Sequence, residues 1–214
     1  MYDYNHTDIS IARQKGNSDM KKRVVVLESN PLLLKRIIEA IENTTEWVVA
    51  NYYRSIAEAL PRIARDQATL FIADVPLHDY ETFRKFTILK SKIPFTNIVI
   101  LHDQNKPGDL LTALRLSAGG YILHEAFLED CDITLESIFH GGLVISAAIA
   151  EDLHEVYMAY SHLFNEQQAI ATSLLIKGKN YEAIAHTLEI SIESAKRIIY
   201  DTFTLLEAES AIRI

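Results

Sequence analysis

Four ionisable side chains follow directly after short apolar runs of the sequence. The runs are KRVVVL, TLFIA, NIVIL and GYIL, and the residues after them are Glu28, Asp74, His102 and His124. Carboxylates and imidazoles are the groups that most often carry a reaction or ligate a metal in proteins. The first question is whether Asp74 is a reactive carboxylate or an ordinary polar residue at the end of a strand.

The elements that must position these residues alternate along the chain. The sequence predicts strands at 22–27, 47–53, 69–73, 97–101 and 120–123, and helices after Pro31, after Ser55 with a kink at Pro61, and at 80–91, 109–117 and 128–139. Strands that are apolar throughout and alternate with helices indicate a parallel sheet covered on both faces. Such sheets carry functional groups beyond the carboxyl ends of their strands, so the four side chains are expected on one rim. The alternative is that loops after strands are simply polar.

After Gly142 the pattern changes to helices alone. Apolar residues at helical spacing predict a linker helix within 143–162. Three further helices are predicted after Phe164, with Ser191 as the N-cap of the last one. A short helix, a tight turn and a longer amphipathic helix form a helix-turn-helix pattern.

The composition restricts the classes of protein that this chain can represent. Hydrophobic residues make up 49% of the 214 residues, enough for a core, and the net charge of −8 argues against a chain-wide surface for nucleic acid. The single cysteine, Cys131, excludes an intramolecular disulfide and fits a reducing cytosol. No apolar run approaches the ~18 residues that would span a bilayer. Residues 1–20 are polar and are expected to form a flexible tail.

The chain resembles bacterial response regulators with a LuxR-type (NarL/FixJ-like) helix-turn-helix output domain, over about residues 21–206. The resemblance rests on ALRLSAGG followed by GYIL, on the third strand ending at Asp74, and on KGKNYEAIAHTLEISIESAKRII. It implies a flavodoxin-like receiver with a doubly wound five-stranded parallel sheet at 21–142, a linker helix at 143–162 and a small all-α domain at 163–214.

The resemblance also assigns positions in a phosphorylation site. Asp74 stands at the phosphoacceptor position, and Glu28 and Ser29 stand where two acids help to hold Mg²⁺. His102 replaces a small hydroxyl residue, and His124 replaces a lysine that contacts the phosphoryl group. With one carboxylate lost, Mg²⁺ binding is expected to be weakened, and no cofactor is expected. An unperturbed imidazole is mostly neutral at pH 7, unlike lysine.

Three interpretations of this altered receiver pocket remain open. The first is a pseudo-receiver that keeps the fold without efficient phosphotransfer. The second is a working receiver in which Glu28 carries Mg²⁺ and protonated His124 serves as the cation. The third is a new site in which His78, His102 and His124 join the acids to bind a transition metal, although no compact metal motif is present.

In the helical domain the resemblance places the second helix of the motif in the DNA major groove. Lys196 and Arg197 would then face phosphates and base edges, Ser191 and Ser194 would contact phosphate, and Lys179 would add a backbone contact.

The charge of this domain weakens the case for DNA. Residues 161–214 contain five basic and seven acidic residues, so the balance is −2 and a monomer is expected to bind DNA weakly. The alternative is a dimerisation or partner-binding module. Phe203, Leu205 and Leu206 form an apolar stripe that could serve a dimer or belong to the core.

The sequence therefore predicts a cytoplasmic, DNA-binding transcriptional regulator that is not an enzyme. We expect control mainly by dimerisation, a partner or a ligand. The expected partners are DNA, a second copy of the chain, and a sensor kinase or another regulator. Binding to a membrane is not expected. The alternatives are a phosphorylation-competent regulator and an interaction module that no longer binds DNA.

Overall fold

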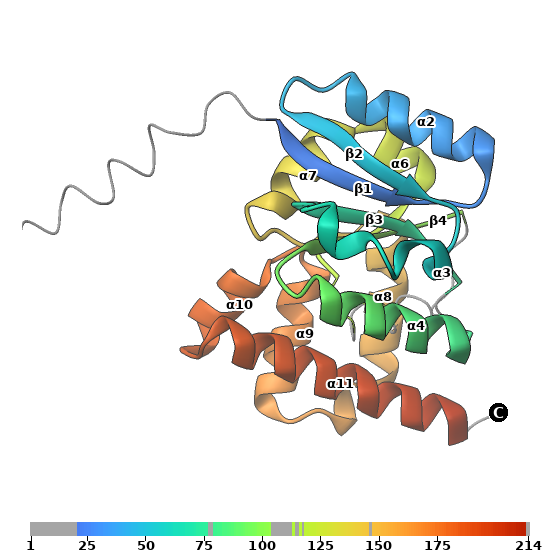
Figure 1. Ribbon diagram of the computed structural model, residues 1–214. Coiled ribbons are helices and arrows are strands. Elements are labelled where there is room, and N and C mark those ends of the chain that lie inside the picture. Colours follow the sequence, from blue (N-terminus) through green and yellow to red (C-terminus); the bar gives the residue numbers. More distant parts are fainter. Residues whose placement is uncertain are drawn as a thin grey trace, which may run out of the picture.

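A parallel sheet with helices on both faces forms the first part of the computed structural model (Figure 1). The structure describes residues 21–76, 79–103, 113, 116, 118–145 and 147–212. The strand order is β2-β1-β3-β4-β5-β6, and every neighbouring pair is parallel. The predicted doubly wound α/β fold is confirmed, and the sheet has one strand more than expected.

The strands of this sheet are Lys22–Leu27 (β1), Trp47–Tyr53 (β2), Leu70–Asp74 (β3), Asn97–His102 (β4), Gly120–Leu123 (β5) and Val144–Ile145 (β6). The helices around it are Pro31–Glu42 (α2), Ile56–Ala59 (α3), Tyr80–Lys92 (α4), His124–Glu129 (α6) and Cys131–Phe139 (α7), with a 3-10 turn at Ile63–Arg65. The helices after the sheet are Ala147–Tyr160 (α8), Glu166–Ile176 (α9), Tyr181–Leu188 (α10) and Ile192–Ile212 (α11), with a 3-10 turn at Ser161–Leu163.

Several predicted elements differ from those observed or lie outside the described residues. The segment predicted as a linker helix, 143–162, contains strand β6 before helix α8 begins. This strand was not predicted, because two residues are too few to show the alternation of apolar and polar side chains that marks a strand. The predicted helix at 128–139 is two helices, since Asp130 leaves the helical conformation between α6 and α7. The tail at 1–20, His78 and most of the predicted helix at 109–117 lie outside the described residues.

Alternating side chains of the strands build two apolar cores, one on each face of the sheet. On one face Val24 and Val26 pack with residues of α2, α6 and α7. On the other face Val25 and Phe71 pack with residues of α3 and α4. This second core continues into the helical domain, where it includes residues of α9, α10 and α11.

Local sequence signals set the starts of the helices. Asn30 Oδ1 accepts hydrogen bonds from the backbone N–H groups of Leu32 and Leu33, and Pro31 occupies the first helical position of α2. Ser55 caps α3 as predicted, but α3 ends at Ala59, so the helix that was expected to continue through a kink at Pro61 is a short helix followed by the 3-10 turn at Ile63–Arg65. These caps fix the path of the chain just beyond the carboxyl ends of β1 and β2.

The helix-turn-helix is formed by α10 and α11. Asn180 Oδ1 caps α10, and Glu189 takes a left-handed conformation where α10 ends. Ser191 Oγ accepts a hydrogen bond from the Ser194 N–H at the start of α11, as its predicted role as N-cap requires. Gly178, with φ +71°, ends α9.

Helix α11 lies alongside α4, so the helical domain packs against the receiver-like domain (Figure 1). Lys196 and Ile192 of α11, with Tyr181 of α10, line a cavity of about 130 Å³ whose other wall includes Asn97 and Gly142 of the receiver-like domain. Burial lowers the pKa of Lys90 on α4, and the nearby charge of Lys196 lowers it further. Part of α11 is therefore turned toward the first domain.

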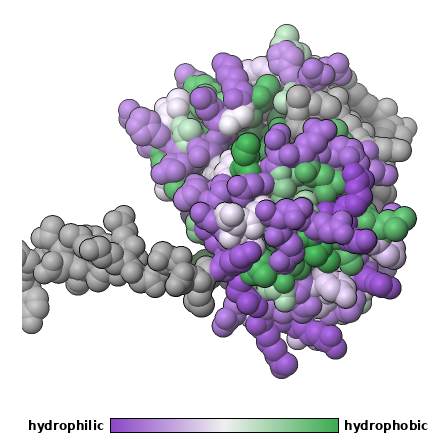
Figure 2. Space-filling view, turned by 90° about the horizontal axis from the view of Figure 1, so that it is seen from above, coloured by the Kyte–Doolittle hydropathy of each residue, from purple (hydrophilic) through white to green (hydrophobic). Residues whose placement is uncertain are grey.

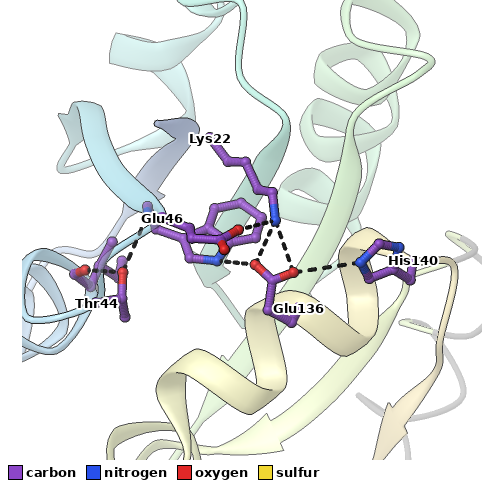
Figure 3. Close-up of polar contacts among 7 residues, drawn as sticks. Lys22, Thr44, Glu46, Glu136 and His140 are labelled. Atoms are coloured by element: carbon purple, nitrogen blue, oxygen red, sulfur yellow. Dashed lines mark hydrogen bonds and ion pairs between the residues drawn. The ribbon is translucent and has the colours of Figure 1, made fainter. Parts of the chain in front are cut away.

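A polar cluster joins β1, β2 and α7 at the amino-terminal edge of the sheet (Figure 3). Glu136 accepts hydrogen bonds from Lys22 Nζ at 2.7 and 2.8 Å and from Trp47 Nε1 at 2.7 Å. Lys22 also donates to Glu46, and His140 Nε2 lies 3.5 Å from Glu136. This cluster lies at the opposite end of the strands from Asp74, so it supports the fold and is separate from the predicted site.

The face of the molecule that carries α2 is mainly polar, with apolar patches between the polar side chains (Figure 2). Over the described part of the chain, none of the helices is both long enough and apolar enough to cross a membrane.

Candidate functional site

Parallel register brings the carboxyl ends of four strands to one rim of the sheet. Leu27 pairs with Ala73, and Asp74 pairs with Leu101. Glu28 follows β1, Asp74 is the last residue of β3, His102 is the last residue of β4, and His124 follows β5. The predicted convergence of these four residues on one rim is therefore observed.

Three of the four side chains meet in one place. His124 Nε2 lies 2.9 Å from Asp74 Oδ2. Glu28, Asp74 and His124 each offer a ligand atom, and the three atoms lie within 4.8 Å of one another. Glu28 and His124 are buried, whereas 29% of the Asp74 side chain is exposed, so Asp74 is the member of the trio that solvent reaches most easily.

Glu28 is the most deeply buried member of the trio, with 2% of its surface exposed. Its Oε1 accepts a hydrogen bond of 2.6 Å from the backbone N–H of Asn30. Burial raises the pKa of Glu28 from 4.5 to about 7; the Asn30 N–H opposes this rise, and the neighbouring Asp74 carboxylate adds to it. Among the described residues, Glu28 Oε2 has no hydrogen-bond partner.

Ser29 and His102 occupy the rim without joining the trio. Ser29 is exposed at the start of the segment that leads to α2. His102 is buried, and its ring stacks on the ring of Tyr121 with 4.1 Å between centroids and 11° between planes. Tyr121 was not among the predicted site residues. The contact depends on the pairing of β4 with β5, which places Tyr121 opposite Ile100, two residues before His102.

The donor atoms of the trio are two carboxylate oxygens and one imidazole nitrogen. Mg²⁺ takes oxygen ligands in near-octahedral geometry and keeps several waters. Here the third donor is an imidazole nitrogen, and Ser29, next to Glu28, offers only a neutral hydroxyl. Weakened Mg²⁺ binding stays a prediction, and the chemistry of these donors is in accord with it.

Four of the five predicted DNA-contacting residues lie on α11 or at its start, and the fifth, Lys179, precedes α10. Arg197 projects from the helix with 82% of its side chain exposed and lies 3.7 Å from Asp201 one turn later. Ser191 and Ser194 are exposed, and their hydroxyl groups are 2.8 Å apart. Lys179 is exposed before α10. These four side chains are accessible, so they remain candidates for contact with DNA.

Lys196 is placed differently from Arg197. Only 35% of its side chain is exposed, and its Nζ lies 3.3 Å from Glu193 and 6.0 Å from the centre of the Tyr181 ring. Since Lys196 also lines the cavity against the receiver-like domain, the surface of α11 is only partly open in this arrangement.

The apolar stripe near the end of α11 belongs mainly to the core. Phe203 is fully buried and Leu206 is 1% exposed, and both pack in the second apolar core. Leu205 is half-buried. Of the two interpretations of this stripe, a dimer contact or part of the core, the structure supports the core for Phe203 and Leu206.

A receiver-like α/β domain followed by a helix-turn-helix domain is the two-domain fold of response regulators with a helix-turn-helix output. No family model matches the sequence, and no curated protein matches it. Solved structures do match in shape. The RcsB response regulator of Salmonella typhimurium has a TM-score of 0.58 at 17% identity, covering 87% of this chain and 92% of that chain.

Two further solved structures extend this likeness. RcsB in a structure of two RcsB dimers bound to two parallel DNAs has a TM-score of 0.58 at 19% identity, covering 83% of this chain and 88% of that chain. A two-component response regulator of the LuxR family from Aurantimonas sp. SI85-9A1 has a TM-score of 0.56 at 18% identity, covering 63% of this chain and 96% of that chain. At these identities the likeness establishes the fold.

Proposed function

We propose that this protein is a cytosolic, DNA-binding transcriptional regulator whose receiver-like domain does not work by efficient phosphotransfer. The observation that carries the proposal is the bond of 2.9 Å between His124 Nε2 and Asp74 Oδ2 beside buried Glu28. The carboxylate that would accept a phosphoryl group is held by an imidazole.

Phosphoryl transfer depends almost entirely on positioned positive charge and hydrogen-bond donors around the transferring group. In this pocket an imidazole replaces a permanent cation, and a buried imidazole stacked on Tyr121 replaces a small hydroxyl. The second acid is replaced by Ser29. Each change removes part of the charge neutralisation that a phosphorylated aspartate needs.

The helical domain supports DNA as the partner through its fold and its exposed groups. The RcsB structure with DNA shares the two-domain fold of this chain. Arg197 is exposed on the helix that would enter the major groove, and arginine is the side chain that most often reads guanine. The net charge of the domain is low, so binding as a homodimer, which doubles the phosphate contacts, is part of the proposal.

The position of Lys196 supports control by domain opening. The side chain lies against the receiver-like domain, so full contact of α11 with a DNA groove requires the two domains to separate or rotate. We propose that dimerisation, a partner protein or a ligand of the receiver-like domain drives this change.

Phosphorylation is tested by incubating the protein with Mg²⁺ and acetyl phosphate and measuring intact mass, with Asp74→Asn as the control. We expect little label on Asp74. Stoichiometric phosphate on the wild type that is absent from Asp74→Asn would show a working receiver and end the pseudo-receiver part of the proposal.

DNA binding is tested by genome-wide capture of bound fragments, followed by affinity measurements on the enriched sites. Arg197→Ala is expected to weaken binding at least about tenfold and to reduce its salt dependence. Lys35→Ala on α2 is the matched control, because Lys35 also forms an exposed pair with an acid four residues later. A protein that enriches no sites would favour the alternative of a protein-interaction module.

A further inference from the structure

We propose that Glu28, Asp74 and His124 bind a divalent first-row transition metal ion of the Zn²⁺ type in preference to Mg²⁺. The proposal concerns the receiver-like domain alone and does not depend on DNA binding. It supplies a chemical class for the ligand that could control the protein.

The first observation is geometric. One donor atom from each residue lies within 4.8 Å of the other two, and the closest pair, His124 Nε2 and Asp74 Oδ2, is 2.9 Å apart. Zinc–nitrogen and zinc–oxygen bonds of about 2.0–2.2 Å in a tetrahedron require donors roughly 3.4 Å apart. Small rotations of the three side chains therefore bring the donors to the separations that an ion needs.

The second observation is independent of that spacing. Glu28 is 98% buried, and within the described part of the chain its Oε2 atom has no hydrogen-bond donor, although Oε1 is bound by the Asn30 N–H. Buried polar atoms are normally paired, and two carboxyl groups held this close together need a proton or a cation between them. A cation between Glu28 and Asp74 would provide the missing partner and neutralise both groups.

The donor types select the class of metal. One imidazole nitrogen with two carboxylate oxygens suits Zn²⁺ and its first-row neighbours, whereas Mg²⁺ requires an oxygen set. The partly exposed side chain of Asp74 leaves a path for the ion, and water completes its coordination. The same ion would occupy Asp74 and thereby compete with its phosphorylation.

The test uses the full chain without a purification tag, stripped with EDTA and titrated with Zn²⁺ and separately with Mg²⁺ by calorimetry. We expect one Zn²⁺ per chain with an affinity more than about a hundredfold above that for Mg²⁺. His124→Ala is expected to weaken Zn²⁺ binding by about a hundredfold or more, and Asp74→Asn is expected to weaken it similarly.

Matched controls separate this site from adventitious binding to the other histidines. His186→Ala removes an exposed imidazole of α10 and is expected to change the affinity less than about twofold. His124→Gln keeps a hydrogen-bonding side chain next to Asp74, so it tests the ligand role if His124→Ala fails to fold. Equal Zn²⁺ affinity in the wild type and His124→Gln, or no one-to-one binding, would overturn the proposal and would leave the DNA experiment unaffected.

Discussion

His124 Nε2 and Asp74 Oδ2 are joined across the end of β4, because β3 and β5 lie on either side of that strand. The bond fastens the start of α6 to the end of β3. A lysine at this position would carry a permanent charge on a flexible stem, whereas the imidazole is compact and held in place. The bond therefore gives the Asp74 carboxylate a partner from within the fold.

Rebuilding those neighbours should restore phosphorylation. The triple variant Ser29→Asp, His102→Thr and His124→Lys returns an acid, a small hydroxyl and a permanent cation to the rim. We expect acetyl phosphate and Mg²⁺ to label this variant at least about tenfold faster than the wild type, measured by intact mass, since charge neutralisation dominates this chemistry.

The control for the triple variant adds Asp74→Asn, which should remove the label. A folded triple variant, judged by circular dichroism, that labels no faster than the wild type would show that other features of the rim prevent the reaction.

The buried carboxyl of Glu28 should make stability depend on pH. Its pKa of about 7 in the folded protein exceeds its ordinary value of 4.5, so the folded state holds a proton that the unfolded state has released. Stability therefore falls as pH rises from about 4.5 to about 7 and does not recover above it. Glu28→Gln should be more stable than the wild type by about 3 kcal/mol at pH 8.

This pH dependence is measured by urea unfolding of EDTA-treated protein between pH 5 and pH 8. The difference between Glu28→Gln and the wild type should grow with pH and should be small at pH 5. A constant difference across this range would show that Glu28 does not titrate there.

Glu136 should be the key residue of the amino-terminal cluster. Glu136→Ala removes the acceptor for Lys22 and leaves Trp47 Nε1 without its partner, so we expect a loss of about 2 kcal/mol in the free energy of unfolding. Glu136→Gln keeps an acceptor and should lose less. Glu46→Ala, which changes only an exposed partner of Lys22, should have little effect, and urea unfolding of the three variants gives the order.

We expect Phe203 to contribute to the free energy of unfolding and not to the contact between two copies of the chain. Phe203→Ala empties a fully buried position in the core of the helical domain, and we expect a loss of about 3 kcal/mol, measured by urea unfolding. Sedimentation velocity should give the same oligomeric state for the folded variant and the wild type. A change of oligomeric state without a loss of stability would assign Phe203 to an interface.

Much of the fold could be predicted because the signals are local. Strands β1, β2 and β5 have the predicted bounds, since each is a short apolar run between turn residues. The cap at Ser55 and the break before Pro61 follow from the same kind of signal. Strand β6 could not be predicted, because its two residues become a strand only by pairing with Gly120 and Tyr121.

The candidate site was predictable in part. A residue directly after a buried parallel strand must lie on the carboxyl rim, so Glu28, Asp74, His102 and His124 could be assigned to it from the sequence. Which of them touch depends on side-chain directions and on the helices that follow. For that reason the stacking of His102 on Tyr121 was not predicted.

The sequence alone determined the alternation of strands and helices, the helix-turn-helix and the identity of the residues on the rim, because hydrophobic periodicity and capping act over a few neighbouring residues. Only the tertiary structure decided that His124 holds Asp74, that Glu28 Oε2 is buried, and that Lys196 of α11 faces the first domain. These relationships join residues up to about a hundred positions apart, and they arise from strand order and packing between elements, which short-range patterns do not encode.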